Sequence, residues 1–223
     1  MKHVYCISGL GADERIFAGV SVAGAQLHFI NWMQPREKED IHSYASRLCG
    51  QITTQNPVLL GVSFGGMMAI EMAKQIPCSK VVLISSVKTK DEVPTWMKSC
   101  GRYRLDNILP SQSLSSYRIL KLIRPLQNYF LGVTSSEEKK IANEYRDNVD
   151  PVYLKWAINQ VLNWKNEWVP PDVVHLHGEK DHIFPIKKIK SPQVIRSGGH
   201  FMIMNRHEQI SELLARALTE SSG

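Results

Sequence analysis

Short apolar runs alternate with amphipathic stretches through the first 85 residues of the chain. Short runs rich in Val, Leu and Ile are typical of buried strands, whereas apolar residues three and four apart indicate a helix. Four runs predict strands at residues 2–8, 26–32, 58–62 and 80–85. Helices are expected between them at residues 14–22, 41–52 and 67–74. This alternation predicts a parallel sheet with right-handed crossovers.

The rhythm changes in the middle of the chain, where no strand is expected from residue 87 to 168. Helix signals fill this part instead: an amphipathic run at residues 117–123, a capping box of Ser135 and Glu138, and a start at Asp150–Pro151. The third helix has an apolar stripe of Tyr153, Trp156, Ala157, Val161 and Trp164. Helices inserted between two sheet strands are typical of a cap over a site. We expect a core of residues 1–86 and 166–223 and a helical cap of residues 87–165.

Two further strands are expected after this insertion, at residues 172–176 and 193–196, and Asn205 is expected to cap a final helix. The total is about six strands with helices between them. The sequence therefore predicts an α/β protein with one mostly parallel sheet, flanked by helices.

Composition limits the functions that such a sheet can carry. The 223 residues are 43% hydrophobic and 22% charged, which is ordinary for one soluble domain. The net charge is +6, and residues 87–165 hold much of the excess, with thirteen Lys and Arg against eight Asp and Glu. These charges are spread out without an aromatic RNA-binding motif, so a solvated surface is expected and not a nucleic-acid site. Attraction of an anionic substrate or acyl carrier is the alternative.

The sequence contains neither a targeting signal nor a metal-binding pattern. Its first apolar run is too short for a signal peptide, and no run is long enough to span a membrane. The four cysteines form no C-x-x-C pair, and we interpret them as free thiols of a cytoplasmic protein. No metal and no other cofactor are expected, because metal-ligand spacing and a G-x-x-x-x-G-K phosphate loop are both missing.

Candidate chemistry begins at Gly61-Val62-Ser63-Phe64-Gly65, between the third expected strand and a helix. A G-x-S-x-G pattern in this context is a nucleophile elbow, which holds a serine hydroxyl up on a strained turn. Gly61 and Gly65 lack the Cβ atoms that would collide in so tight a turn. The Phe64 amide is expected beside the serine oxygen, where negative charge develops during acyl transfer.

The Gly9-Leu10-Gly11 loop after the first strand allows two interpretations. A dinucleotide-binding fold begins with such glycines, but Glu14 occupies the position of the third one. A serine hydrolase needs a small turn here for its oxyanion loop, and we prefer this interpretation.

Ser63, Asp181 and His200 each follow the carboxyl end of an expected strand, which is the edge where α/β sheets bind ligands. Their order along the chain, Ser then Asp then His, is one known order of a catalytic triad. In such a triad Ser63 attacks a carbonyl, His200 accepts the serine proton and returns it to the leaving group, and Asp181 orients the imidazole.

These motifs together resemble the α/β-hydrolase superfamily over nearly the whole chain, in particular compact serine esterases that lack the two leading strands and carry a helical cap. HGEKDHIFP is similar to the family's acid-bearing H-G-x-x-D followed by x-x-P, and SGGHF to its G-G-H. The resemblance implies that the amides of Leu10 and Phe64 are the two oxyanion donors. Ser8 stands where the family often has a histidine. Asp91 is the alternative acid, because some members place the acid after the preceding strand.

The resemblance also implies hydrolysis of carboxylic esters or thioesters through a covalent acyl-enzyme. Non-hydrolytic acyl transfer, lyase chemistry and small-molecule binding on the same scaffold are the alternatives. His177 and His182 are expected to be structural neighbours of the triad. Bulky apolar residues are expected to pack around the site and to receive an apolar substrate group: Met67, Trp156, Ile183, Phe184, Phe201 and Met202.

Overall fold

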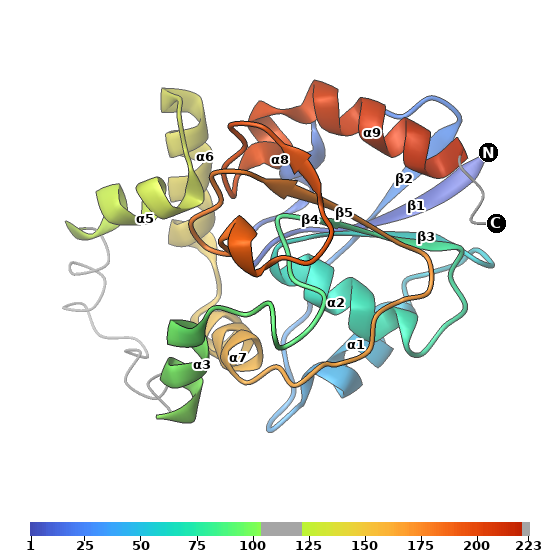
Figure 1. Ribbon diagram of the computed structural model, residues 1–223. Helices are drawn as coiled ribbons and strands as arrows, with labels where there is room; N and C mark the ends of the chain where they lie inside the picture. Colours follow the sequence, from blue (N-terminus) through green and yellow to red (C-terminus); the bar gives the residue numbers. More distant parts are fainter. Residues whose placement is uncertain (104–121, 220–223) are drawn as a thin grey trace.

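The computed structural model describes residues 1–103 and 122–219, which contain one six-stranded sheet (Figure 1). Neighbouring strands are all parallel, in the order β2-β1-β3-β4-β5-β6. The strands are β1 (Lys2–Ile7), β2 (Ala25–Ile30), β3 (Val58–Val62), β4 (Lys80–Ile84), β5 (Val173–Gly178) and β6 (Gln193–Ile195). The α/β architecture with a mostly parallel sheet of about six strands is therefore confirmed.

The strand order reverses at β1. The chain places β2 on one side of β1 and then returns to place β3 on the other side. At such a switch point the connections that leave the two central strands diverge in opposite directions, and open α/β sheets bind ligands there. The loop after β1 and the turn after β3 both lie at this point.

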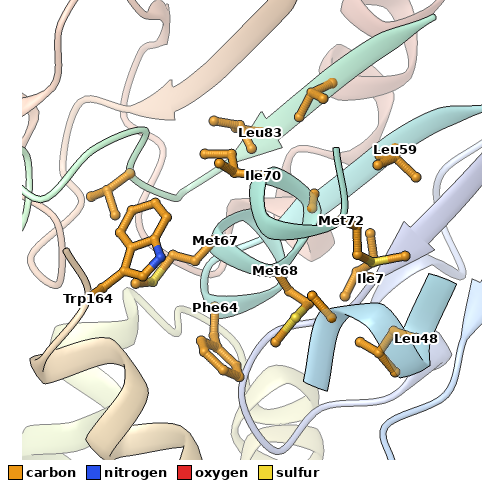
Figure 2. Packing of buried hydrophobic residues seen from close by; sticks show 14 of the residues in the cluster. Ile7, Leu48, Leu59, Phe64, Met67, Met68, Ile70, Met72, Leu83 and Trp164 are labelled. Atoms are coloured by element: carbon orange, nitrogen blue, oxygen red, sulfur yellow. The ribbon is translucent and has the colours of Figure 1, made fainter. Parts of the chain in front are cut away.

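Helices cover both faces of the sheet, as Figure 1 shows. One face carries α1 (Ile41–Cys49) and α2 (Phe64–Ala73); the other carries η1 (Glu14–Phe17), α8 (Met202–Asn205) and α9 (His207–Thr219). Strand residues alternate between the two hydrophobic clusters, since Leu59 packs in the first and Leu60 in the second. Figure 2 shows side chains from all around α2 packed in the first cluster, and every residue from Phe64 to Met72 is buried.

Four helices of the described residues lie between β4 and β5: α3 (Thr95–Arg102), α5 (Arg124–Leu131), α6 (Ser136–Asn148) and α7 (Pro151–Leu162). Figure 1 shows them gathered beyond one end of the sheet. The Ser135–Glu138 capping box opens α6, and the Asp150 side chain caps α7 with Pro151 in its first turn. The described part of residues 87–168 contains no strand. The predicted run at residues 117–121 lies outside the described residues, and the division into core and cap stays a prediction.

Some helix boundaries differ from the sequence-based expectation. The helix expected at residues 14–22 is one short turn, η1, and Gly19 lies so close to the His207 ring that a Cβ there would be 2.6 Å away. Asn205 ends α8 and does not cap α9, because the Arg206 amide still bonds to the Met202 carbonyl (2.8 Å). A contact with a residue distant in sequence thus accompanies the first difference, and a local backbone bond the second.

Candidate active site

Ser63 lies in the turn between β3 and α2, with a backbone conformation (φ 54°, ψ −119°) that non-glycine residues rarely adopt. Close backbone packing forces this turn. A Cβ on Gly61 would collide with the backbone of Gly65, and a Cβ on Gly65 would collide with the carbonyl of Ile7. The Ser86 hydroxyl donates to the Ser63 carbonyl (2.7 Å) from the end of the neighbouring strand. The elbow is therefore fixed by its backbone and by β4.

His200 lies between Ser63 and Asp181. Its Nδ1 is 2.8 Å from Asp181 Oδ2, and its Nε2 is 2.8 Å from Ser63 Oγ. A carboxylate can only accept, so Nδ1 carries the proton and Nε2 accepts from the serine hydroxyl. In this arrangement an imidazole can remove the proton from a serine. The structure thus brings the three predicted triad residues together in bonding geometry.

A tight turn holds Asp181, whose exposed fraction is only 3%. The amides of Ile183 and Phe184 both donate to its Oδ1 (2.9 Å each), which leaves Oδ2 for His200. Burial raises the pKa of Asp181. Its attraction to and hydrogen bond with His200, together with His177 and the Phe184 amide, outweigh burial and place this pKa below its ordinary value. Asp181 therefore stays an ionised acceptor.

The loop after β1 runs directly beside the elbow, since a Cβ on Gly9 would lie 3.6 Å from the Ser63 Cβ. Among the described residues, the amides of Leu10 and Phe64 have no hydrogen-bond acceptor. Phe64 is the first residue of α2, where an amide lacks an intrahelical partner and the helix dipole is positive. These are the two amides predicted to receive an oxyanion.

Ser8 takes over a bracing role at the position where a histidine is common. Its hydroxyl donates to the Ala12 carbonyl (2.7 Å) and accepts from Trp32 Nε1 (2.8 Å). Ser8 thereby connects the end of the Gly9–Ala12 turn to its start and holds both against Trp32, which follows β2. The loop keeps a fixed shape without a histidine.

Helices α5 to α7 contact the loops at this edge of the sheet. A Cβ on Gly11, after β1, would lie 3.2 Å from Val149. The Phe201 amide, after β6, donates to the Leu131 carbonyl (2.8 Å). Tyr129 stacks on His182, after β5, with ring centroids 4.6 Å apart. The insertion therefore borders the loops that carry the candidate site.

Aromatic side chains connect the elbow to α7. The Trp32 ring stacks on Phe64 (5.4 Å) and contacts Tyr153 (5.5 Å), and Trp156 contacts Tyr44 (4.2 Å) and Phe64 (6.1 Å). Sequence analysis missed Trp32, although its position two residues beyond a strand that ends at this edge was a usable signal. Tyr153 was recognised only as part of an apolar stripe.

Two of the predicted pocket residues lie beside triad or elbow residues. The Phe184 ring meets the His200 ring edge to face at 5.7 Å, and Trp156 contacts Phe64. Trp156 also donates from Nε1 to the Glu39 carbonyl (2.7 Å), so its orientation is fixed.

All six predicted pocket residues pack in or against the two hydrophobic clusters. Met67 is fully buried and Ile183 half-buried in the first cluster, near α2. Phe201 and Met202 pack in the second cluster, on the opposite face of the sheet. A position next to a motif in the sequence therefore does not determine on which face of the sheet a side chain packs.

His200 bonds to Asp181 and not to the alternative acid Asp91. It is exposed and lines an open cavity of about 550 Å³, together with Lys88, Lys90 and Glu92. Two ion pairs line this cavity, Lys90 with Glu167 and Lys88 with Glu92.

The described residues give three further findings. Their four cysteines are free, and burial raises the pKa of the Cys49 thiol to about 11. No described helix is both long and apolar enough to cross a membrane. Within the same residues, no three His, Cys, Asp or Glu side chains are grouped as metal ligands would be.

Comparisons with known proteins give matches at the level of structure. Neither a family profile nor a curated protein sequence matches this chain. An α/β hydrolase fold protein from Burkholderia ambifaria gives a TM-score of 0.72 at 14% identity, covering 96% of this chain and 90% of that one. A malate-bound esterase from Thermogutta terrifontis gives 0.70 at 15% identity, covering 98% and 90%. A bromoperoxidase from Bacillus anthracis gives 0.68 at 18% identity, covering 98% and 92%. This chain has the α/β-hydrolase fold.

Proposed function

We propose that the protein is a serine hydrolase that cleaves carboxylic esters or thioesters through a covalent acyl-enzyme. The observation that carries this proposal is the continuous hydrogen-bonded series Ser63–His200–Asp181, with both contacts of His200 at 2.8 Å. The free amides of Leu10 and Phe64 beside it support acyl transfer, because the reaction needs donors where the carbonyl oxygen becomes negative.

In the first half of the reaction, Ser63 Oγ attacks the carbonyl carbon of the substrate while His200 Nε2 takes the hydroxyl proton. The tetrahedral oxyanion accepts hydrogen bonds from the Leu10 and Phe64 amides. Asp181 stabilises the imidazolium without taking its proton. The bond to the leaving group then breaks, and His200 returns the proton to the alcohol or thiol.

In the second half, a water molecule replaces the leaving group. His200 removes a proton from this water, which attacks the acyl carbon of the ester on Ser63. The second oxyanion collapses, Ser63 recovers its proton from His200, and the carboxylic acid leaves. No step requires a metal or an organic cofactor.

A fluorophosphonate probe tests this proposal, because it reacts only with an activated serine. We expect stoichiometric labelling, located at Ser63 by peptide mass spectrometry and lost in a folded Ser63→Ala variant. Turnover of esters and thioesters of graded acyl length should fall by roughly 10⁴-fold or more in the same variant. Absence of labelling in the folded native protein would favour a binding protein on this scaffold. Labelling without release of free acid would favour acyl transfer.

A further inference from the structure

Two buried histidines lie on the same face of β5, two residues apart. His175 is 3% exposed and His177 is fully buried, and their rings meet edge to face at 5.2 Å. Residues at this spacing in a strand point to the same side of the sheet. That side is the α2 face, because His175 pairs in register with Leu83, which belongs to the first cluster.

The hydrogen bonds of these histidines determine their protonation. His177 Nε2 lies 2.7 Å from the Phe184 carbonyl, and His175 Nε2 lies 3.1 Å from the Ser86 carbonyl. A carbonyl only accepts, so Nε2 carries the proton in both rings. Each Nδ1 is buried without a partner. Burial lowers the pKa of both rings, to about 3 for His175, so both are neutral donors.

The carbonyl that His177 holds belongs to the turn that holds the candidate acid. The Phe184 amide donates to Asp181 Oδ1, while the Phe184 carbonyl accepts from His177. His177 therefore fixes Phe184 from one side, and Phe184 fixes Asp181 from the other. The distance from His177 Nε2 to Asp181 Oδ2 is 3.6 Å, which is too long for a hydrogen bond.

We propose that His177 is a positioning residue for the reaction of Ser63: by holding the turn at Phe184, it aims the free carboxylate oxygen of Asp181 at His200. This inference rests on the proposed function. A neutral imidazole suits this role for two reasons. Its Nε2–H donates one hydrogen bond from a buried position on β5 to the Phe184 carbonyl, and it adds no charge beside the Asp181–His200 pair. Glu92 also lies near His177, and Lys88 lies near His175.

His175 provides a matched control from the same strand and face. Its Nε2 donates to the carbonyl of Ser86, and the Ser86 hydroxyl donates to the Ser63 carbonyl. His175 therefore braces the elbow and has no hydrogen bond to the turn at Asp181. Loss of either imidazole leaves a buried carbonyl without its donor, so both changes should lower stability.

The test is a double-mutant cycle between His177 and Asp181, with the second-order rate of fluorophosphonate labelling and the kcat and KM of ester hydrolysis as readouts. His177→Leu removes the donor, and His177→Gln keeps an amide donor near the Nε2 position. We expect His177→Leu to lower labelling and kcat by roughly 10-fold to 100-fold at nearly constant KM, by analogy with the partners that orient metal-bound histidines. His177→Gln should recover most of this loss.

The decisive expectation concerns the Asp181→Asn background, where His177→Leu should change the rate by less than about twofold, since it acts through Asp181. His175→Leu should keep its full effect there. Equal effects of His177→Leu in both backgrounds would overturn the inference. If His177→Leu does not fold, the cycle is run with His177→Asn, whose shorter amide does not reach Phe184. A native protein that fails to label Ser63 would instead overturn the proposed function, and this inference with it.

Discussion

The elbow and the inserted helices meet at the same edge of the sheet, but different interactions hold them there. Backbone contacts hold the elbow: Gly61 and Gly65 permit approaches that any Cβ would block. Side chains supply much of what holds the insertion, through the hydrogen bonds from Trp156 to the Glu39 carbonyl and from Trp164 to the buried Glu71 carboxylate (2.8 Å). One backbone bond, from the Phe201 amide to the Leu131 carbonyl, adds to them. Helix α5 has no buried residue at all.

This difference predicts how each region tolerates change. A turn that close backbone packing determines has one geometry, and one added Cβ atom is enough to disrupt it. A surface held by a few side chains can be repacked at moderate cost, which suits a part that adapts to different substrates. We therefore expect substitutions in the elbow to abolish the reaction and substitutions in the insertion to change its selectivity.

The largest effect is expected for Gly65→Ala. The new Cβ would overlap backbone oxygens of β1, which cannot move without displacing the strand, so the free energy of unfolding should fall by at least about 3 kcal/mol and probe labelling should be lost. Gly24→Ala measures the cost of backbone strain without close packing, because Gly24 has a positive φ (76°), which Gly65 does not, and has nothing within 4 Å of its Cβ position. Chemical denaturation of both variants measures the difference. A loss in Gly65→Ala no larger than that in Gly24→Ala would contradict the close packing inferred at Gly65.

A second large effect should appear on acidification, and the part due to histidine arises outside residues 87–165, which contain no histidine. His175 is neutral in the folded protein with a pKa of about 3, whereas in the unfolded chain its pKa is near 6.5. The unfolded state therefore binds the proton first, and stability present above pH 6.5 is lost as the pH falls toward 3, by at most about 5 kcal/mol. Denaturation between pH 7 and 5 should show a smaller slope in His175→Gln. An unchanged slope would contradict a buried neutral His175.

The same contrast explains what the sequence could and could not predict. The elbow and the strands were predictable because their sequence patterns mark them, although contacts with Ile7 and Ser86 hold the elbow in place. Strand β3 has the predicted bounds, and the Ser63–His200 contact follows from the ends of parallel strands. The pocket was harder to derive from the sequence, and its residues stay a prediction. Met202 is adjacent to the G-G-H motif, yet it packs on the opposite face, since the direction of α8 depends on tertiary contacts. The role of Trp32 likewise depends on Ser8, twenty-four residues earlier.

A moderate effect is expected for Trp156→Ala in the insertion. The substitution removes the ring contacts with Tyr44 and Phe64 and the bond to the Glu39 carbonyl, so stability should fall by about 3 kcal/mol. Preference among esters of graded acyl length should shift, because the ring touches the residue after the serine. Trp96→Ala is the control, since Trp96 lies in the same insertion and is 55% exposed. A loss of stability with unchanged preference would make Trp156 purely structural.

The smallest effect concerns Tyr153, where the two regions touch. Its hydroxyl is buried without a hydrogen-bond partner, and the Gly11 amide approaches it without forming an aligned bond. Removing an unpartnered buried hydroxyl leaves no group unsatisfied, so Tyr153→Phe should change the free energy of unfolding by less than about 0.5 kcal/mol or raise it. Tyr145→Phe is the matched control, because the Tyr145 hydroxyl donates to Asp13 (3.1 Å) and its loss should cost about 1 kcal/mol. Thermal denaturation of the two variants compares them directly. If Tyr153→Phe is the more damaging change, the hydroxyl supports the Gly9–Gly11 loop in solution, and the contact between the insertion and this loop is polar and not only aromatic.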